Sequence, residues 1–143
     1  MVKLTHPDRS RPTAGGEGTL HRVGTIELRT ELACSCERAF ALSVDLDLQL
    51  RATARFATRI VGGRRSGGIG PGETVTWQLW PFSVPIRHTS VISEYERPVW
   101  FVDEMVRGVL AQFRHEHRFS LRHDGGAYVT KAGSDEVSVI DIR

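Results

Sequence analysis

The sequence predicts an α+β fold: one curved antiparallel sheet of about six to seven strands, with two short helices inserted after the first strand. Apolar and polar residues alternate in a segment near residue 25, and again in consecutive segments from residue 73 toward the C-terminal end. Between these regions, residues 35–52 carry helix-capping side chains and the apolar spacing of short helices. This order predicts a meandering sheet with both helices packed on one face.

The first strand and both helices are expected between residues 25 and 52. Residues 25–32, TIELRTEL, alternate as in a strand with one buried face. Ser35 can cap a helix that places Glu37 in its first turn, where a negative charge suits the helix dipole. The buried side of this helix would consist of Ala39, Phe40 and Leu42. A second short helix is expected from Leu46 to Ala52.

Further strands are expected along the rest of the chain. The Gly-rich run GGRRSGGIGPG, residues 62–72, matches neither the phosphate-binding loop nor the dinucleotide-binding pattern, so we interpret it as turns. The turn HDGG, residues 123–126, precedes the last strand. The expected strands are 55–61, 73–80, 86–95, the two strands within 97–119, and a final extended stretch through Val129 and Val137 to Ile142.

Residues 97–119 predict a hairpin that forms one wall of a pocket. With a turn near Gly108, Asp103 would lie opposite His115, and Phe101 opposite His117. This face would be mostly apolar but would carry a carboxylate and two imidazoles, the composition of a small-molecule site. Arg114, Glu116 and Arg118 would face the other side as a solvated charge ladder. The candidate ligand-binding residues are Trp77, Phe101, Asp103, Met105, Phe113, His115, His117 and Phe119.

The carboxylate and the imidazoles allow three interpretations. Asp103, His115 and His117 could bind a metal, because alternate strand positions place two imidazoles on one face. An Asp–His pair could instead act as a general base, with Asp103 and His115 as the candidate catalytic residues. We expect structural histidines that hydrogen-bond to Asp103 and Glu104, with no metal and no cofactor. Cys34 and Cys36 are too close in sequence to bridge easily and are weaker ligand candidates still.

Composition separates the first residues from the rest. Residues 1–22 mix Pro, Gly, Ser and Thr with charge and predict a flexible leader, and residues 23–143 predict one domain. The leader carries four basic and two acidic residues, and residues 23–143 carry fifteen of each, which argues against a nucleic-acid partner. The chain shows no secretory signal and no apolar run of about 18 residues that could span a membrane, so we expect a cytoplasmic protein.

The order of elements and three motifs resemble bacterial members of the START-like superfamily, also called SRPBCC, with polyketide cyclase/dehydrase-type relatives. The motifs are GIGPGETVTW at 68–77, RPVWFVDEMVRG at 97–108 and FRHEHRF at 113–119, and the resemblance covers about residues 24–139. It implies a helix-grip fold, in which a curved sheet grips a long C-terminal helix and a hydrophobic cavity lies between sheet and helices. It also implies that the recurring motif includes Asp103, Phe113, His115, His117 and Phe119.

The chain departs from this pattern at two places. Many relatives carry a histidine near the end of the second helix, where this chain has Gln49 and Leu50. Relatives also continue past the last strand into the long helix, whereas this chain stops at Arg143 after SDEVSVIDIR. We therefore expect the C-terminal helix to be absent. The concave face would then need another cover, and we expect a homodimer that forms through that face.

These observations predict a binding protein for a small hydrophobic or aromatic molecule rather than an enzyme. The first alternative is a polyketide cyclase or dehydratase that uses an Asp–His pair as a general base. The second alternative is a protein-interaction module that uses the exposed sheet.

Overall fold

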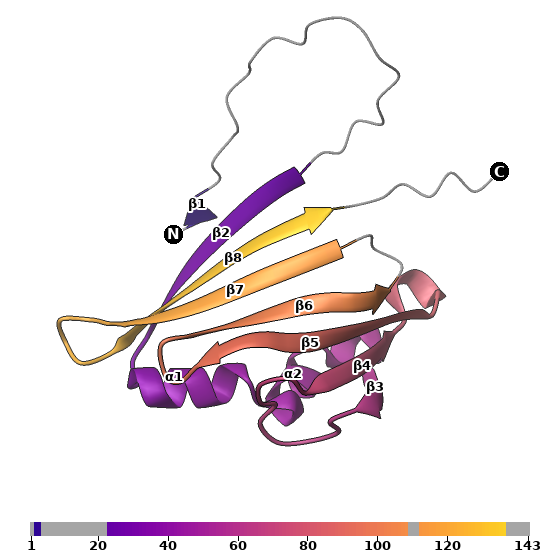
Figure 1. Ribbon diagram of the computed structural model, residues 1–143, viewed down its shortest axis with the longest axis horizontal. Helices are drawn as coiled ribbons and strands as arrows, with labels where there is room; N and C mark the ends of the chain where they lie inside the picture. The colour runs from indigo at the N-terminus through magenta and orange to yellow at the C-terminus, as the bar shows by residue number, and fades with distance from the viewer. Residues whose placement is uncertain (1, 4–22, 109–111, 137–143) are drawn as a thin grey trace, which may run out of the picture.

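The computed structural model describes residues 2–3, 23–108 and 112–136, and these form an antiparallel sheet with helices against one face (Figure 1). Seven strands follow one another in the spatial order β2-β8-β7-β6-β5-β4-β3, and the two-residue β1 pairs with β2 at the edge. The strands are β1 Val2–Lys3, β2 Val23–Leu32, β3 Arg59–Gly63, β4 Thr74–Leu79, β5 Ile86–Glu96, β6 Trp100–Gly108, β7 Gln112–Leu121 and β8 Ala127–Glu136. The α+β prediction is confirmed. The rest of the predicted leader and the predicted extension to Ile142 lie outside the described residues.

The two helices begin and end where their caps place them. Helix α1 spans Cys36–Ser43, and the Ser35 hydroxyl accepts a hydrogen bond from the Arg38 backbone N–H at 3.2 Å. Helix α2 spans Leu46–Ala52, and an Asp45 carboxylate oxygen accepts from the Leu48 N–H at 2.9 Å. Helix α1 contacts β7 and β8, near the end of the sheet where β2, β7 and β8 converge (Figure 1). Both helices are confirmed, and Ala39 and Phe40 are buried as predicted, whereas Leu42 is only half-buried.

The strand predicted over residues 55–61 is wrong in its first half. Residues Ala54–Phe56 form the 3-10 turn η1, and β3 begins only at Arg59. The reason is the backbone at Ala57, which adopts a left-handed conformation with φ 51° and turns the chain out of the helix before the strand can start. Alanine gives no sequence signal for that conformation.

The core forms where α1 meets the inner face of the sheet. Phe40 is fully buried, and its ring lies edge-on to Tyr95 and Phe101, with centroids 5.1 and 5.5 Å apart. The Phe40 ring also lies 5.1 Å from the ring of Phe119 on β7. Because one helix side chain contacts three aromatic rings of the sheet, Phe40 fixes α1 against the sheet.

Within the described residues, α1 and α2 are the α-helices, and no long C-terminal helix is among them. None of the helices described is long and apolar enough to cross a membrane.

We expect Phe40→Ala to lower the free energy of unfolding by about 3–5 kcal/mol, because it removes a fully buried ring that the neighbouring aromatic rings cannot replace. Urea denaturation measures this loss. Phe82→Ala is the matched control, since Phe82 is fully exposed and its loss should change stability by less than about 0.5 kcal/mol. Equal, small losses in both variants would contradict the described packing of α1.

Candidate functional site

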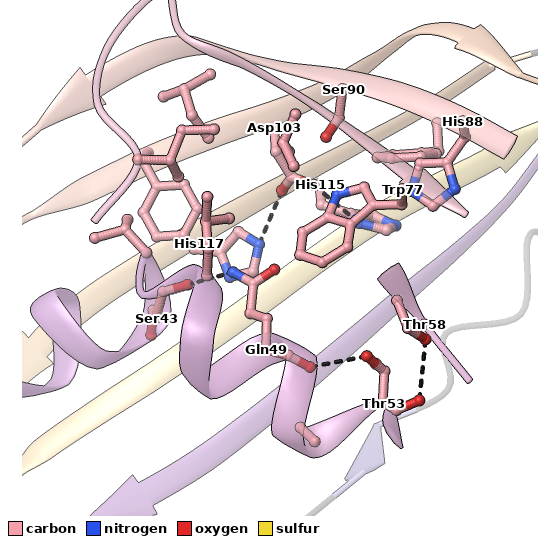
Figure 2. A pocket seen from close by; sticks show the side chains of 18 of the residues that line it. Ser43, Gln49, Thr53, Thr58, Trp77, His88, Ser90, Asp103, His115 and His117 are labelled. Atoms are coloured by element: carbon pink, nitrogen blue, oxygen red, sulfur yellow. Dashed lines mark hydrogen bonds and ion pairs between the residues drawn. The ribbon is translucent and has the colours of Figure 1, made fainter. Parts of the chain in front are cut away.

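A cavity of about 670 Å³ lies between the inner face of the sheet and the helical segment that includes α2 and η1 (Figure 2). Most of its wall is apolar: Val44, Leu46, Ala52, Phe56, Ile69, Val75, Trp77, Leu79, Ile92, Phe101 and Phe113. The polar side chains on its wall are Ser43, Gln49, Thr53, Thr58, His88, Ser90, Asp103, His115, His117 and Lys131.

The pairing of β6 with β7 places the predicted polar residues on this wall. Asp103 pairs with His115, and Phe101 pairs with His117, as the sequence predicts. Directly paired residues of antiparallel strands share a face, so the carboxylate and both imidazoles point into the cavity. Figure 2 shows the three side chains gathered above α2.

Asp103 lies between the two imidazoles. One carboxylate oxygen, Oδ1, is 3.0 Å from Nε2 of His117, and the other, Oδ2, is 3.7 Å from Nδ1 of His115. His117, the diagonal neighbour of Asp103, is thus within hydrogen-bonding distance of the carboxylate, and His115, directly opposite, is in contact with it as well. The expected hydrogen bond from a histidine to Glu104 is wrong: Glu104 faces the outer side, where it accepts from Nε of Arg114 at 3.2 Å.

Each imidazole also stacks on an aromatic ring. His117 lies on Phe101 with ring centroids 4.3 Å apart and an interplanar angle of 10°, and His115 lies on Phe113 at 4.6 Å and 22°. On the β8 side, the His115 ring lies so close to Gly133 that a Cβ there would be 2.6 Å from Cδ2 of His115. The stacking and the glycine fix the ring planes, so the imidazoles enter the cavity in defined orientations.

The charge of Asp103 is retained although its side chain is only 22% exposed. Burial by itself would raise the pKa of Asp103, but the hydrogen bonds of His115 and His117 and the charges of these imidazoles act in the opposite direction. Together they hold the pKa of this carboxyl well below its usual range. The site therefore contains a carboxylate at neutral pH.

A third histidine lies nearby on β5. His88 pairs with Trp77 of β4 and lines the same cavity. Burial lowers the pKa of His88, the charge of Asp103 acts against this shift, and that of His115 adds to it. At neutral pH, the neutral imidazole is therefore the favoured form of His88.

The structure brings six of the eight predicted ligand-binding residues to the cavity: Trp77, Phe101, Asp103, Phe113, His115 and His117. Met105 pairs with Ser90, but its side chain runs along β6, where a Cβ on Gly108 would lie 2.6 Å from the Met105 sulfur. Phe119 is buried beneath Phe40. Neither Met105 nor Phe119 lines the cavity.

Several lining residues were missed by sequence reasoning. His88 and Ser90 continue the inward alternation of β5, and Lys131 occupies the corresponding place on β8, so strand periodicity could have found all three. Gln49 lies on α2, and its side-chain amide donates to the backbone oxygen of Ser43 at 2.9 Å. The sequence gives no signal that this amide reaches the cavity.

No metal site is evident in the part of the chain that the structure describes, where no group of three or more His, Cys, Asp or Glu side chains is placed to hold an ion. Cys34 and Cys36 have free thiols and pack against the core beside α1. The described residues thus offer a carboxylate and imidazoles for hydrogen bonding rather than a ligand set for an ion.

No protein-family model matches the chain, and no curated protein matches it. Several solved structures, however, are similar to this chain in fold. Protein CV1439 from Chromobacterium violaceum has a TM-score of 0.65 at 13% identity, covering 81% of this chain and 82% of that one. Protein TTHA0849 from Thermus thermophilus has a TM-score of 0.63 at 13% identity, covering 82% and 77%. The major latex-like protein 151 from Panax ginseng has a TM-score of 0.59 at 11% identity, covering 85% and 84%.

These likenesses concern the fold. With the curved antiparallel sheet and the two helices after its first long strand, they confirm the α+β, START-like type of fold that the sequence predicts.

We expect Asp103→Asn to lower the free energy of unfolding by about 1–3 kcal/mol at neutral pH, because it removes the charge that the two imidazoles face. The folded pKa of Asp103 lies below the unfolded value of about 3.9, so its stabilisation is complete above that pH and is lost as the pH falls through the folded pKa.

Urea denaturation at neutral pH and at successively lower pH measures this effect. The difference between wild type and Asp103→Asn should narrow below about pH 4. A variant as stable as wild type at neutral pH would show that the carboxylate does not hold the cluster together.

Proposed function

We propose that this protein binds a small hydrophobic or aromatic molecule carrying one polar group, and that the site is the cavity beneath α2. One observation carries the proposal: a space of about 670 Å³ has mainly apolar walls and a single cluster of titratable groups around Asp103. Ligand sites usually have volumes of about 300–1,000 Å³ and combine apolar walls with a few polar groups that fix orientation.

The two kinds of wall suggest how the ligand lies. Its carbon skeleton would lie between Trp77 of the sheet and Phe56 of η1, with Phe113 beside it. Its polar group, a hydroxyl or a carbonyl, would point to His117 and Gln49, which can donate or accept hydrogen bonds at the same wall. Asp103 would act through His117, by holding that ring in place.

Phe113→Asp tests the site. The substitution removes a ring that an apolar ligand would contact and puts a carboxylate into the cavity beside His115, so we expect it to lower the affinity for the apolar dye phenylnaphthylamine at least tenfold. A fluorescence titration measures the affinity. Leu121→Asp is the matched control, because Leu121 is 72% exposed and does not line the cavity, and this variant should bind as wild type does. Unchanged dye binding by a folded Phe113→Asp variant would contradict the assignment.

A second candidate function is a polyketide cyclase or dehydratase. The observation that favours it is the 3.0 Å contact between Asp103 and His117, because a carboxylate that orients an imidazole raises its basicity toward an enolisable ligand. Turnover of a poly-β-keto thioester would separate the two functions. If His117→Gln and His115→Gln abolish turnover while binding persists, the protein is an enzyme, whereas weaker binding without any turnover favours a binding protein.

We also propose that two copies associate through the inner face of the sheet. Leu28 pairs with Lys131, which lines the cavity, so Leu28 faces inward, and Ile26 two residues earlier shares that face. Their side chains are nevertheless 42% and 52% exposed. A partner that covered them would remove apolar surface from water.

Light scattering after size exclusion tests the association. We expect a dimer at micromolar concentration, and Leu28→Lys should shift it toward monomer because a charge would enter the apolar contact. The control is Val99→Lys, because Val99 is 46% exposed and lies in the turn between β5 and β6 rather than on the inner face of the sheet. A wild-type chain that stays monomeric would show that this face is not an interface between copies.

A further inference from the structure

The turn between β4 and β5, residues 80–85, exposes a large apolar side chain that does not pack against the rest of the described residues. Phe82 is 100% exposed and Val84 is 59% exposed. Single exposed apolar residues are common, but Phe82 and Ser83 also adopt left-handed backbone conformations, with φ 53° and 65°, which bulky residues rarely adopt. Such strain at an exposed aromatic residue points to a role for the ring outside the folded chain.

The turn is fixed to the wall of the cavity. The Trp80 N–H donates to the backbone oxygen of Phe56 at 2.9 Å, and Phe56 lines the cavity. Leu79, directly before Trp80, lines it as well. The β4–β5 turn is therefore at the end of the sheet to which the cavity extends, on the side where β6 ends (Figure 1).

Four exposed arginines surround this turn. Arg59 lies over the Trp80 ring at 5.4 Å, Arg55 lies over the Phe56 ring at 4.5 Å, and Nε of Arg87 donates to Gln78 at 2.8 Å. Arg107 pairs with Thr89 one row further along the sheet. The segments that carry these arginines, residues 54–63, 74–92 and 105–108, contain no acidic residue.

The charge of these arginines is not neutralised within the described residues, where none of the four forms an ion pair with a carboxylate. Arginines elsewhere on the outer face behave differently. Arg114 contacts Glu94, Glu104 and Glu116, and Arg118 contacts Glu116. The positive charge around the turn is thus local, although residues 23–143 carry equal numbers of basic and acidic residues.

We propose that residues 80–85, with the four arginines around them, dock on the surface of an anionic phospholipid membrane. An aromatic ring at the tip can enter the headgroup region, while arginines keep their charged ends at the lipid phosphates. An exposed aromatic ring with cationic charge around it complements a fluid anionic surface. The proposal goes beyond ligand binding, and its link to the cavity rests on the proposed function.

Co-sedimentation of the full chain with vesicles tests the docking. The vesicles are phosphatidylcholine alone or phosphatidylcholine with phosphatidylglycerol. We expect binding to the anionic vesicles only, weakening as salt is added. Phe82→Ala should lower the partition coefficient about tenfold through loss of apolar burial, and Arg107→Gln should lower it about fivefold through loss of one surface charge.

Two matched controls carry the same changes elsewhere. Leu121→Ala removes an exposed apolar side chain on β7, and Arg38→Gln removes an exposed charge on α1, so both should bind vesicles as wild type does. No binding to anionic vesicles, or equal losses in Phe82→Ala and Leu121→Ala, would overturn the proposal.

Contact of this turn with a second copy of the chain, instead of a membrane, would give a different result. If Phe82→Ala changes the oligomeric state in light scattering without vesicles, residues 80–85 contact a second copy and the membrane proposal is wrong. Binding of phenylnaphthylamine in solution separates the two functions, because Phe82→Ala should retain it. If Phe82→Ala loses vesicle binding but still binds the dye, the result supports docking at this turn. If the wild-type chain binds vesicles but not the dye, membrane docking stands and its link to the cavity is wrong.

Discussion

The Asp103 carboxylate and the His117 imidazole, 3.0 Å apart on neighbouring strands, determine the character of the cavity. Burial by itself would raise the pKa of this carboxyl, but two imidazoles on β7 face it and keep it charged. The pair requires β6 and β7 to be in register, and the stacked Phe101 and Phe113 rings hold the imidazoles in place. An otherwise apolar cavity thereby gains one polar wall of fixed geometry.

The inner face of the sheet serves as core at one end and as cavity wall at the other, and the helices cause the difference. Phe40 of α1 fills the space over Phe101 and Phe119. At the C-terminal end of α2, the short side chains of Ala52 and Thr53 line the cavity, where no large ring fills the space. On the outer face, the arginines near β7 form ion pairs with carboxylates. Among the described residues, the arginines near the β4–β5 turn form no such pairs, so the excess positive charge lies at that end of the sheet.

Alternation and capping explain how much could be predicted from the sequence. Period two along residues 113–119 determines which side chains face inward, and the register of Asp103 with His115 follows from a symmetric hairpin. Alternation does not say how a long side chain runs, so it misplaces Met105, nor which helix covers which rings, so it assigns Phe119 to the cavity wall. The position of the Gln49 side chain depends on a tertiary contact, and the turn at Ala57 depends on a left-handed backbone conformation. A single sequence predicts neither of them.

A crystal structure of the chain grown with phenylnaphthylamine tests the central claim most directly. We expect the naphthyl ring between Trp77 and Phe56, with the dye's amine within hydrogen-bonding distance of His117 or Gln49. Dye bound on the outer face or against Phe82, with the cavity beneath α2 left to solvent, would contradict that claim.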